Sequence, residues 1–528
     1  MKKIFYFVAA SLLMTSCLED RAIEAYNEDF VNLFGETDPL HTWKMVENQS
    51  VEVSLDKPSR VKIYVKAGNA YRLAADYENV SGTRTLSYDA PMGCEDIHVT
   101  VDGVPYQRGY SRTGEEVSQT GIYLTNKYKS FTYETIKGYY DNFRPDGNLL
   151  PETGDNTDNV TFVDYKFRSN GGTYTFYPIY WGGIFHHNYG LYYYDGVTKV
   201  EIPFINDHKA GALLQRKNVE TDAWENVSDD YAYDYFFTGD KKYDSSDKIL
   251  QSLCYNIHLP EGTEFGFYVD IIHELEDGTK NNRGRYYSDP ELNTNSPIST
   301  FAYLQKDAQS SYITVEDYDD NDYNDFIFVL EGAPTPVVND PIKYIYAVED
   351  LGGTNDFDFN DVVFSVSHIN GQPNATVQPL AAGGIYPAQI CFDGISYGEI
   401  HDMFGKTSTK EMVNTKAGTT KSSMLNSDSF EVPVGINWSQ TATKYGKSGN
   451  GFSVKVKILD KPDKEVSTCE PGSNAAPQML VLSEDWLWPT ETTRISDAYP
   501  EFQTWGQNYT DKTWANTYNS NLVVNWKE

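Results

Sequence analysis

Two short acidic segments contain the side chains of this sequence that are best suited to binding a cation. Both read Glu-Asp, then Asp-x-Asp-aromatic-Asn-Asp, and both run directly into an apolar stretch that is typical of a strand. Their residues are Glu316, Asp317, Asp320, Asp322, Asn324 and Asp325 in the first copy, and Glu349, Asp350, Asp356, Asp358, Asn360 and Asp361 in the second. The repetition of the pattern favours a chemical role over chance.

Calcium is the cation that this pattern fits best, because it takes about six to eight oxygen ligands from carboxylates, amides and carbonyls. In an extended loop, the side chains of Asp356, Asp358 and Asn360 would point the same way and could converge on one ion. The Glu-Asp pair before each core could close the shell from across a hairpin. Magnesium fits less well, since it usually keeps several waters. The sequence therefore predicts up to two calcium sites.

The last aspartate of each copy has a different expected role. Asp325 and Asp361 have the opposite parity, so we expect them to hold the loop by accepting hydrogen bonds from backbone amides. They also stand where an EF-hand requires glycine, and a strand follows instead of a helix, so neither copy is an EF-hand. The alternative interpretation is a turn without a metal, which Asp and Asn also favour.

The elements that must position these loops are β-strands. Apolar residues alternate with polar ones in segments such as 51–55, 61–65 and 97–101, and the chain holds 41 tyrosines, which favour strands. We expect a mainly β fold of several tandem, jelly-roll-like β-sandwich domains with few short helices. One helix is expected near the start, where Ile23, Tyr26, Phe30 and Leu33 have helical spacing and Gly35 follows.

Turn-rich and Pro-rich stretches suggest the boundaries of the domains. The predicted segments are a signal peptide over 1–16, a lipid-anchored tether over 17–37, a small β-sandwich over 38–125, a linker over 126–158, a β-sandwich with the first acidic loop over 159–332, a linker over 333–340, and a β domain with the second acidic loop over 341–528.

The first residues resemble the signal of a bacterial lipoprotein. Two lysines precede an apolar stretch over 4–14, which is too short to span a bilayer, and Thr15-Ser16-Cys17 ends it. The resemblance implies cleavage before Cys17, lipidation of Cys17 and outer-membrane lipid as a partner. The following Leu18-Glu19-Asp20 is similar to a surface-export signal of some Gram-negative lineages, which implies a location on the outer membrane, facing outward.

Net charge and cysteine content limit the classes of partner and of binding site that the sequence supports. The formal net charge of −33 disfavours nucleic acid as a partner and suits a soluble surface outside the cell. The four cysteines after Cys17 form no CxxC pair, so they do not indicate a zinc or redox site. An exported protein can form disulfides. Cys391–Cys469 is the pair to test first, and free buried thiols fit the sequence equally well.

Two parts of the chain resemble known families. Residues 159–332 carry a Pro-x-Gly strand, a Tyr-Ser loop and the first acidic motif, and resemble a domain of unknown function found in bacterial surface proteins. Residues 341–528 combine the second motif with a C-terminal Trp-rich series from Trp486 to Trp505, and resemble the C-terminal domain of LruC-type lipoproteins. The resemblance implies a surface lipoprotein and carries no catalytic activity.

No catalytic motif stands out, so we expect a protein that is not an enzyme. His273-Glu274 lacks the second histidine of a zincin, and neither a nucleophile elbow nor a P-loop occurs. The expected role is binding or adhesion, with a host or cell-surface protein as partner, or a structural role in the envelope. Alternatives are a glycan-binding component of a polysaccharide-capture system, with Tyr177, Tyr180 and Trp181 as a stacking platform, and an uncharacterised glycoside-active enzyme.

Overall fold

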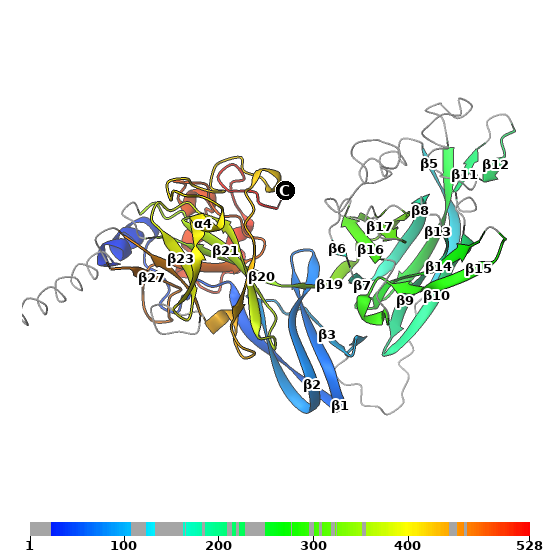
Figure 1. Cartoon of the computed structure of the whole chain (residues 1–528), viewed down its shortest axis with the longest axis horizontal. Helices are drawn as coiled ribbons and strands as arrows, with labels where there is room; N and C mark the ends of the chain where they lie inside the picture. Colours follow the sequence, from blue (N-terminus) through cyan, green and yellow to red (C-terminus); the bar gives the residue numbers. More distant parts are fainter. Residues whose placement is uncertain are drawn as a thin grey trace, which may run out of the picture. The chain divides into compact units, whose positions relative to one another are not determined.

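The structure is a computed structural model, and its strands form several antiparallel sheets (Figure 1). It describes residues 23–106, 123–132, 162–163, 165–181, 185–208, 214–217, 221–226, 249–275, 277–294, 300–305, 309–317, 323, 325–350, 355–442, 451–458 and 462–527. Strands account for 51% and helices for 10%, which confirms the expected mainly β fold with few short helices. The predicted signal peptide and Cys17 lie outside the described residues.

The chain divides into two compact units. Unit 1 joins Met1–Gly68 and Leu73–Ile97 to Pro341–Glu528, whereas unit 2 consists of Asn69–Arg72 and His98–Asp340. Residues 73–97, placed by sequence in a small sandwich over 38–125, thus belong with the C-terminal part of the chain. The two acidic loops fall in different units.

Unit 2 is a β-sandwich. Within this unit, one sheet contains the run β10-β9-β14-β7-β19, which is part of a 10-stranded sheet, with β15 paired to β14; the other has the order β12-β11-β13-β8-β18-β17-β16-β6, with β5 paired to β13. The elements are β3 (Ile97–Val101), β4 (Val104–Pro105), β5 (Tyr123–Thr132), β6 (Phe162–Val163), β7 (Tyr165–Arg168), β8 (Gly172–Trp181), β9 (His186–Asp195), β10 (Thr198–His208), β11 (Leu214–Lys217), β12 (Trp224–Asn226), β13 (Ile249–Leu259), β14 (Glu264–Glu274), β15 (Lys280–Tyr287), η4 (Pro290–Leu292), β16 (Thr300–Gln305), β17 (Ser310–Glu316), β18 (Phe326–Glu331) and β19 (Thr335–Pro341).

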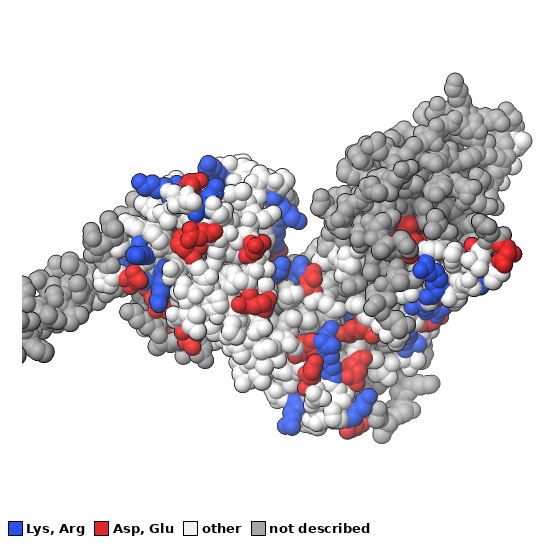
Figure 2. Space-filling model, viewed as in Figure 1, with Lys and Arg blue, Asp and Glu red and all other residues white. Residues whose placement is uncertain are grey.

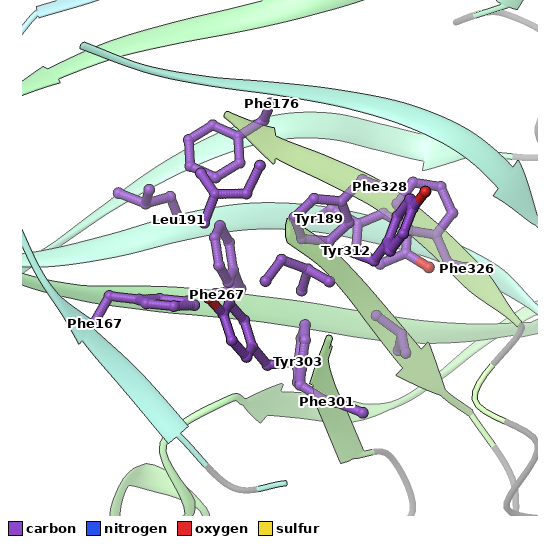
Figure 3. Packing of buried hydrophobic residues seen from close by; sticks show 14 of the residues in the cluster. Phe167, Phe176, Tyr189, Leu191, Phe267, Phe301, Tyr303, Tyr312, Phe326 and Phe328 are labelled. Carbon is purple, nitrogen blue, oxygen red and sulfur yellow. The ribbon is translucent and has the colours of Figure 1, made fainter. Parts of the chain in front are cut away.

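The core of unit 2 is aromatic and lies between its two sheets (Figure 3). Phe267 of β14 meets Phe328 of β18 with ring centroids 5.1 Å apart, and Tyr189 of β9 stacks on Phe326 of β18 at 4.0 Å. Edge-to-face and stacked ring pairs add to the free energy of apolar burial. The abundant tyrosines therefore fill the interior of the sandwich.

Unit 1 holds two further sheets, of order β25-β22-β21-β20-β28 and β24-β23-β26-β27. Its elements are β1 (Val46–Ala67), most of β2 (Ala70–Pro91), β20 (Lys343–Val348), β21 (Val362–His368), β22 (Asn374–Ala381), β23 (Ala388–Phe392), β24 (Ile395–Glu399), α4 (Ile400–Met403), η5 (Lys421–Ser423), β25 (Phe430–Pro433), η6 (Gln440–Ala442), β26 (Phe452–Val456), β27 (Lys464–Val466), β28 (Met479–Ser483), α5 (Ile495–Ala498), α6 (Phe502–Gln507) and η7 (Trp514–Asn516).

A helix over 23–34, within the segment assigned to the tether, packs into the core of unit 1. Tyr26, Phe30 and Phe34 are buried, which gives an apolar stripe at a spacing of four residues. Leu33 was expected on this stripe but is 43% exposed, because Phe34 takes the inward position. The stripe contacts Phe357 of the second acidic loop, with centroids 5.0 Å from Tyr26 and 5.6 Å from Phe30.

Among the described residues, no disulfide is formed: Cys94 is half-buried, and Cys254, Cys391 and Cys469 are buried. The Cys391–Cys469 disulfide, one of two options in the sequence, is therefore not formed. On the face shown in Figure 2, acidic and basic side chains are interspersed over the described surface of each unit. In the second acidic loop, the carboxylates of Glu349, Asp356 and Asp358 lie close together, and Glu349 and Asp358 are buried.

Candidate metal centre

The second acidic loop connects β20 to β21, two adjacent strands of a sheet in unit 1. Glu349 and Asp350 directly follow β20, and Asp361 directly precedes β21, so the strand pairing brings both ends of the motif together. Residues 351–354 of this loop lie outside the described part of the chain. The hairpin supplies the rigid frame that a metal site needs.

Three carboxylates of the motif converge. Ligand oxygens of Glu349, Asp356 and Asp358 lie within 4.8 Å of one another. Glu349 and Asp358 are each only 1% exposed, and Asp356 is half-buried. This spacing suits a single ion that binds oxygens at about 2.3–2.6 Å, as calcium does. The group brings together an acid from the strand end and two alternate acids of the core.

The carboxylates of the loop destabilise one another's charged forms. Burial raises the pKa of Glu349 well above its usual value, and the charges of Asp361 and Asp358 raise it further. Burial, with the neighbouring carboxylates, likewise raises the pKa values of Asp358 and Asp361 well above the ordinary range, and burial raises that of Asp356. A divalent cation at this point would remove the repulsion and favour ionisation of every one of these groups.

Hydrogen bonds hold the loop in shape. Asp361 Oδ2 accepts a hydrogen bond from the backbone N–H of Asp350 at 2.6 Å, the role expected from its parity. Asn360 Nδ2 donates to the carbonyl of Pro489 at 3.1 Å. Phe357 and Phe359 adopt φ of 54° and 53°, which few residues with side chains do, and both are fully buried. Their rings lie in the aromatic core of unit 1 and anchor the loop there.

A carboxylate that sequence reasoning missed joins the group from the C-terminal part of the chain. Burial and the charges of Asp356 and Asp350 raise the pKa of Glu491 to about 7. Next to it, the backbone N–H of Thr492 donates to Asp358 Oδ2 at 2.9 Å. Glu491 stands more than a hundred residues from the motif and in no acidic pattern of its own, so no spacing in the sequence pointed to it.

The first acidic loop connects β17 to β18 in unit 2 and repeats the same bonds. The N–H of Asp317 donates to Asp325 Oδ2 at 2.5 Å, and the N–H of Tyr323 donates to Glu316 Oε2 at 3.1 Å. The matching bond of the second loop joins Phe359 N–H to Glu349 Oε2 at 3.4 Å. Tyr323 also shares the positive φ, at 51°. Asp320, Asp322 and Asn324 lie outside the described residues.

The first loop differs in having a histidine against it. His187 Nε2 lies 2.9 Å from Asp317 Oδ2, and both side chains are buried. Burial lowers the pKa of His187 to about 3, so the ring is neutral near pH 7 and Nε2–H donates to the carboxylate. Asp317 Oδ2 thus accepts a hydrogen bond from a neutral, buried imidazole.

The proposed sugar platform is described only in part. Tyr177 is fully buried, and its hydroxyl donates to Glu331 Oε1 at 3.0 Å, so its ring face is not open to a ligand. The side chains of Tyr180 and Trp181 lie outside the described residues.

No model of a known protein family matches the chain, and no curated protein is similar to it. Among the described residues, none of the helices has both the length and the apolar character needed to cross a membrane.

Proposed function

We propose that the loop over 349–361 binds one calcium ion, which stabilises unit 1. The observation that carries the proposal is the buried convergence of Glu349, Asp356 and Asp358. Burying several carboxylates together is costly unless a cation compensates them. The donor set consists of oxygens, which calcium and other hard cations prefer.

We extend the proposal to the first loop, for a second calcium ion. Its support is the pair of hydrogen bonds, Asp317 N–H to Asp325 and Tyr323 N–H to Glu316, that the two loops share. A loop braced in the same way would present the alternating Asp320, Asp322 and Asn324 in the same direction. The ions would then stabilise both units independently.

For the whole chain we propose a lipid-anchored protein of the outer-membrane surface, related to LruC-type lipoproteins, with a binding, adhesive or structural role. Its support is the leader ending at Cys17 and the motif series of residues 341–528. Extracellular fluids are rich in calcium, so structural calcium sites suit such a location. Labelling of intact cells with a membrane-impermeant reagent tests the location, and an unlabelled protein in labelled cells would exclude it.

Calorimetric titration of the chelator-treated chain with CaCl₂ tests the calcium proposal. We expect two bound ions, a higher midpoint of thermal unfolding with calcium than with EDTA, and weaker binding of magnesium. The double variant Asp356→Asn/Asp358→Asn should lose one ion, whereas Asp497→Asn, at an exposed position, should lose none. Absence of both heat of binding and a midpoint shift in the unsubstituted chain would overturn the proposal.

A further inference from the structure

A buried amide oxygen of the acidic loop has no hydrogen-bond partner among the residues that the structure describes. Asn360 is fully buried, and among the described residues its Oδ1 accepts no hydrogen bond. Its Nδ2 donates to the carbonyl of Pro489, so the amide orientation is fixed: the reverse would set two oxygens against each other. A buried oxygen without a partner destabilises the folded chain, because it has lost its hydrogen bonds to water. This oxygen can bind a cation or accept a hydrogen bond.

Glu491 presents a second such oxygen to the same small space. Its Oε2 is buried and has no hydrogen-bond partner among the described residues. A methyl group on Gly383 would overlap Asn360 Oδ1 and lie 2.9 Å from Glu491 Oε2, so both oxygens face that glycine. A methyl group on the next residue, Gly384, would lie 2.8 Å from Asp350 Oδ2. Because Gly383 and Gly384 have no side chains, they leave space beside these oxygens, which repel one another.

The chain around Glu491 is also bonded to the acidic loop by its backbone. Thr492 N–H donates to Asp358 Oδ2 at 2.9 Å, and Ile495 N–H donates to the carbonyl of Phe357 at 2.9 Å. Ile495 begins α5, which is followed by the buried Tyr499 of the aromatic core. The segment over 489–495 therefore lies along the loop and leads directly into the C-terminal core.

We propose that Asn360 Oδ1 and Glu491 complete the oxygen shell begun by Glu349, Asp356 and Asp358, so that the ion clamps the segment over 489–495 onto the acidic loop. The inference rests on the proposed calcium site. It adds two ligands to that site and assigns to the bound ion the role of holding the segment over 489–495 in place. With the ion bound, oxygens from the β20 end, the loop core and the C-terminal segment share one partner. Without it, Asn360 Oδ1 and Glu491 Oε2 lie together beside Gly383, and neither has a hydrogen-bond partner among the described residues.

Comparison of Glu491→Gln with Glu470→Gln tests the ligand role, because Glu470 is exposed on the same unit. We expect Glu491→Gln to weaken calcium binding at one site by about tenfold or more, the equivalent of about 1.4 kcal/mol, and Glu470→Gln to leave it unchanged. In EDTA, Glu491→Gln should unfold at the same or a higher temperature than the unsubstituted chain, since a repelled charge is gone. In calcium, it should unfold at a lower one.

Hydrogen exchange of the unsubstituted chain tests the clamp itself. Calcium should slow exchange of the amides of Thr492 and Ile495 by about tenfold or more relative to EDTA. Gly383→Ala, which fills the space beside the two oxygens, should abolish this protection. If the chain binds calcium but Glu491→Gln binds it equally well and exchange over 489–495 is unchanged, the clamp is overturned while the calcium site stands. If no calcium binds, the proposed function itself fails.

Discussion

Asp361 Oδ2 accepts a hydrogen bond from the backbone N–H of Asp350 at 2.6 Å, and Asp325 Oδ2 repeats the bond to Asp317 N–H at 2.5 Å in the other unit. The last aspartate of each motif thus holds the end of the loop against its beginning. The two loops share this brace although they lie in different sheets and stand 36 residues apart. The same brace therefore fixes the two ends of both loops.

The brace predicts the effect of one substitution in each loop. Asp325→Ala should lower the free energy of unfolding by about 1–3 kcal/mol, because a buried N–H loses its acceptor. Asp361→Ala should lower it by less, because loss of this carboxylate also relieves repulsion from Asp350 and Asp358. Asp361→Asn and Asp325→Asn keep an acceptor oxygen and should lose less. Denaturant unfolding in EDTA measures the effect without the contribution of bound cation. Equal losses for alanine and asparagine at either position would show that charge, and not the hydrogen bond, matters there.

His41 predicts how the stability of unit 1 depends on pH. Its Nδ1 accepts from Trp43 N–H at 2.9 Å, Nε2 donates to the carbonyl of Trp505 at 3.0 Å, and burial lowers its pKa to about 4. Between pH 6.5 and 4, the unfolded chain binds a proton that the folded chain does not. Stability from this group is therefore complete above pH 6.5 and falls as pH decreases, by about 3 kcal/mol at most.

The comparison of His41→Gln with the unsubstituted chain isolates this contribution from that of the carboxylates. The difference in unfolding free energy between the two proteins should shrink as pH falls from 6.5 to 4. His273→Gln, at an exposed position in unit 2, serves as the control and should leave the profile unchanged. A difference that stays constant over this range would contradict the prediction.

A buried ion network in unit 2 predicts a large effect of one lysine. Lys166 Nζ lies 3.1 Å from Asp289 Oδ2 and 3.3 Å from Glu264 Oε1, and Glu264 Oε2 lies 2.5 Å from His98 Nε2. All four side chains are buried. Lys166→Met should lower the free energy of unfolding by about 3–5 kcal/mol, because it leaves two carboxylates without their shared cation.

Lys199→Met is the matched control, since Lys199 pairs with Glu201 at 3.1 Å on a partly exposed surface. Its loss should be about 0–1 kcal/mol. Denaturant unfolding followed by signals from unit 2 measures both variants. A loss for Lys166→Met no larger than that for Lys199→Met would show that the network contributes little.

Much of the fold and part of the site follow from local patterns. Alternation of apolar and polar residues predicts strands, because successive side chains of a strand face opposite sides. The same parity separated Asp361 from Asp356 and Asp358, and the bond from Asp350 N–H to Asp361 agrees with it. In the first helix, the spacing of Tyr26 and Phe30 was sufficient, but the choice between Leu33 and Phe34 depended on which side chain met Phe357 and Phe502.

The sequence by itself thus determined the strand-rich class, the position of the two acidic loops and the bracing role of Asp325 and Asp361. Only the tertiary structure decided that Glu491 and Gly383 lie beside the second loop, that His187 lies against the first, and that residues 73–97 belong with the C-terminal part. The reason is physical: local periodicity sets which face of a strand is buried, whereas the partner of that face comes from distant segments, chosen by how the whole interior packs.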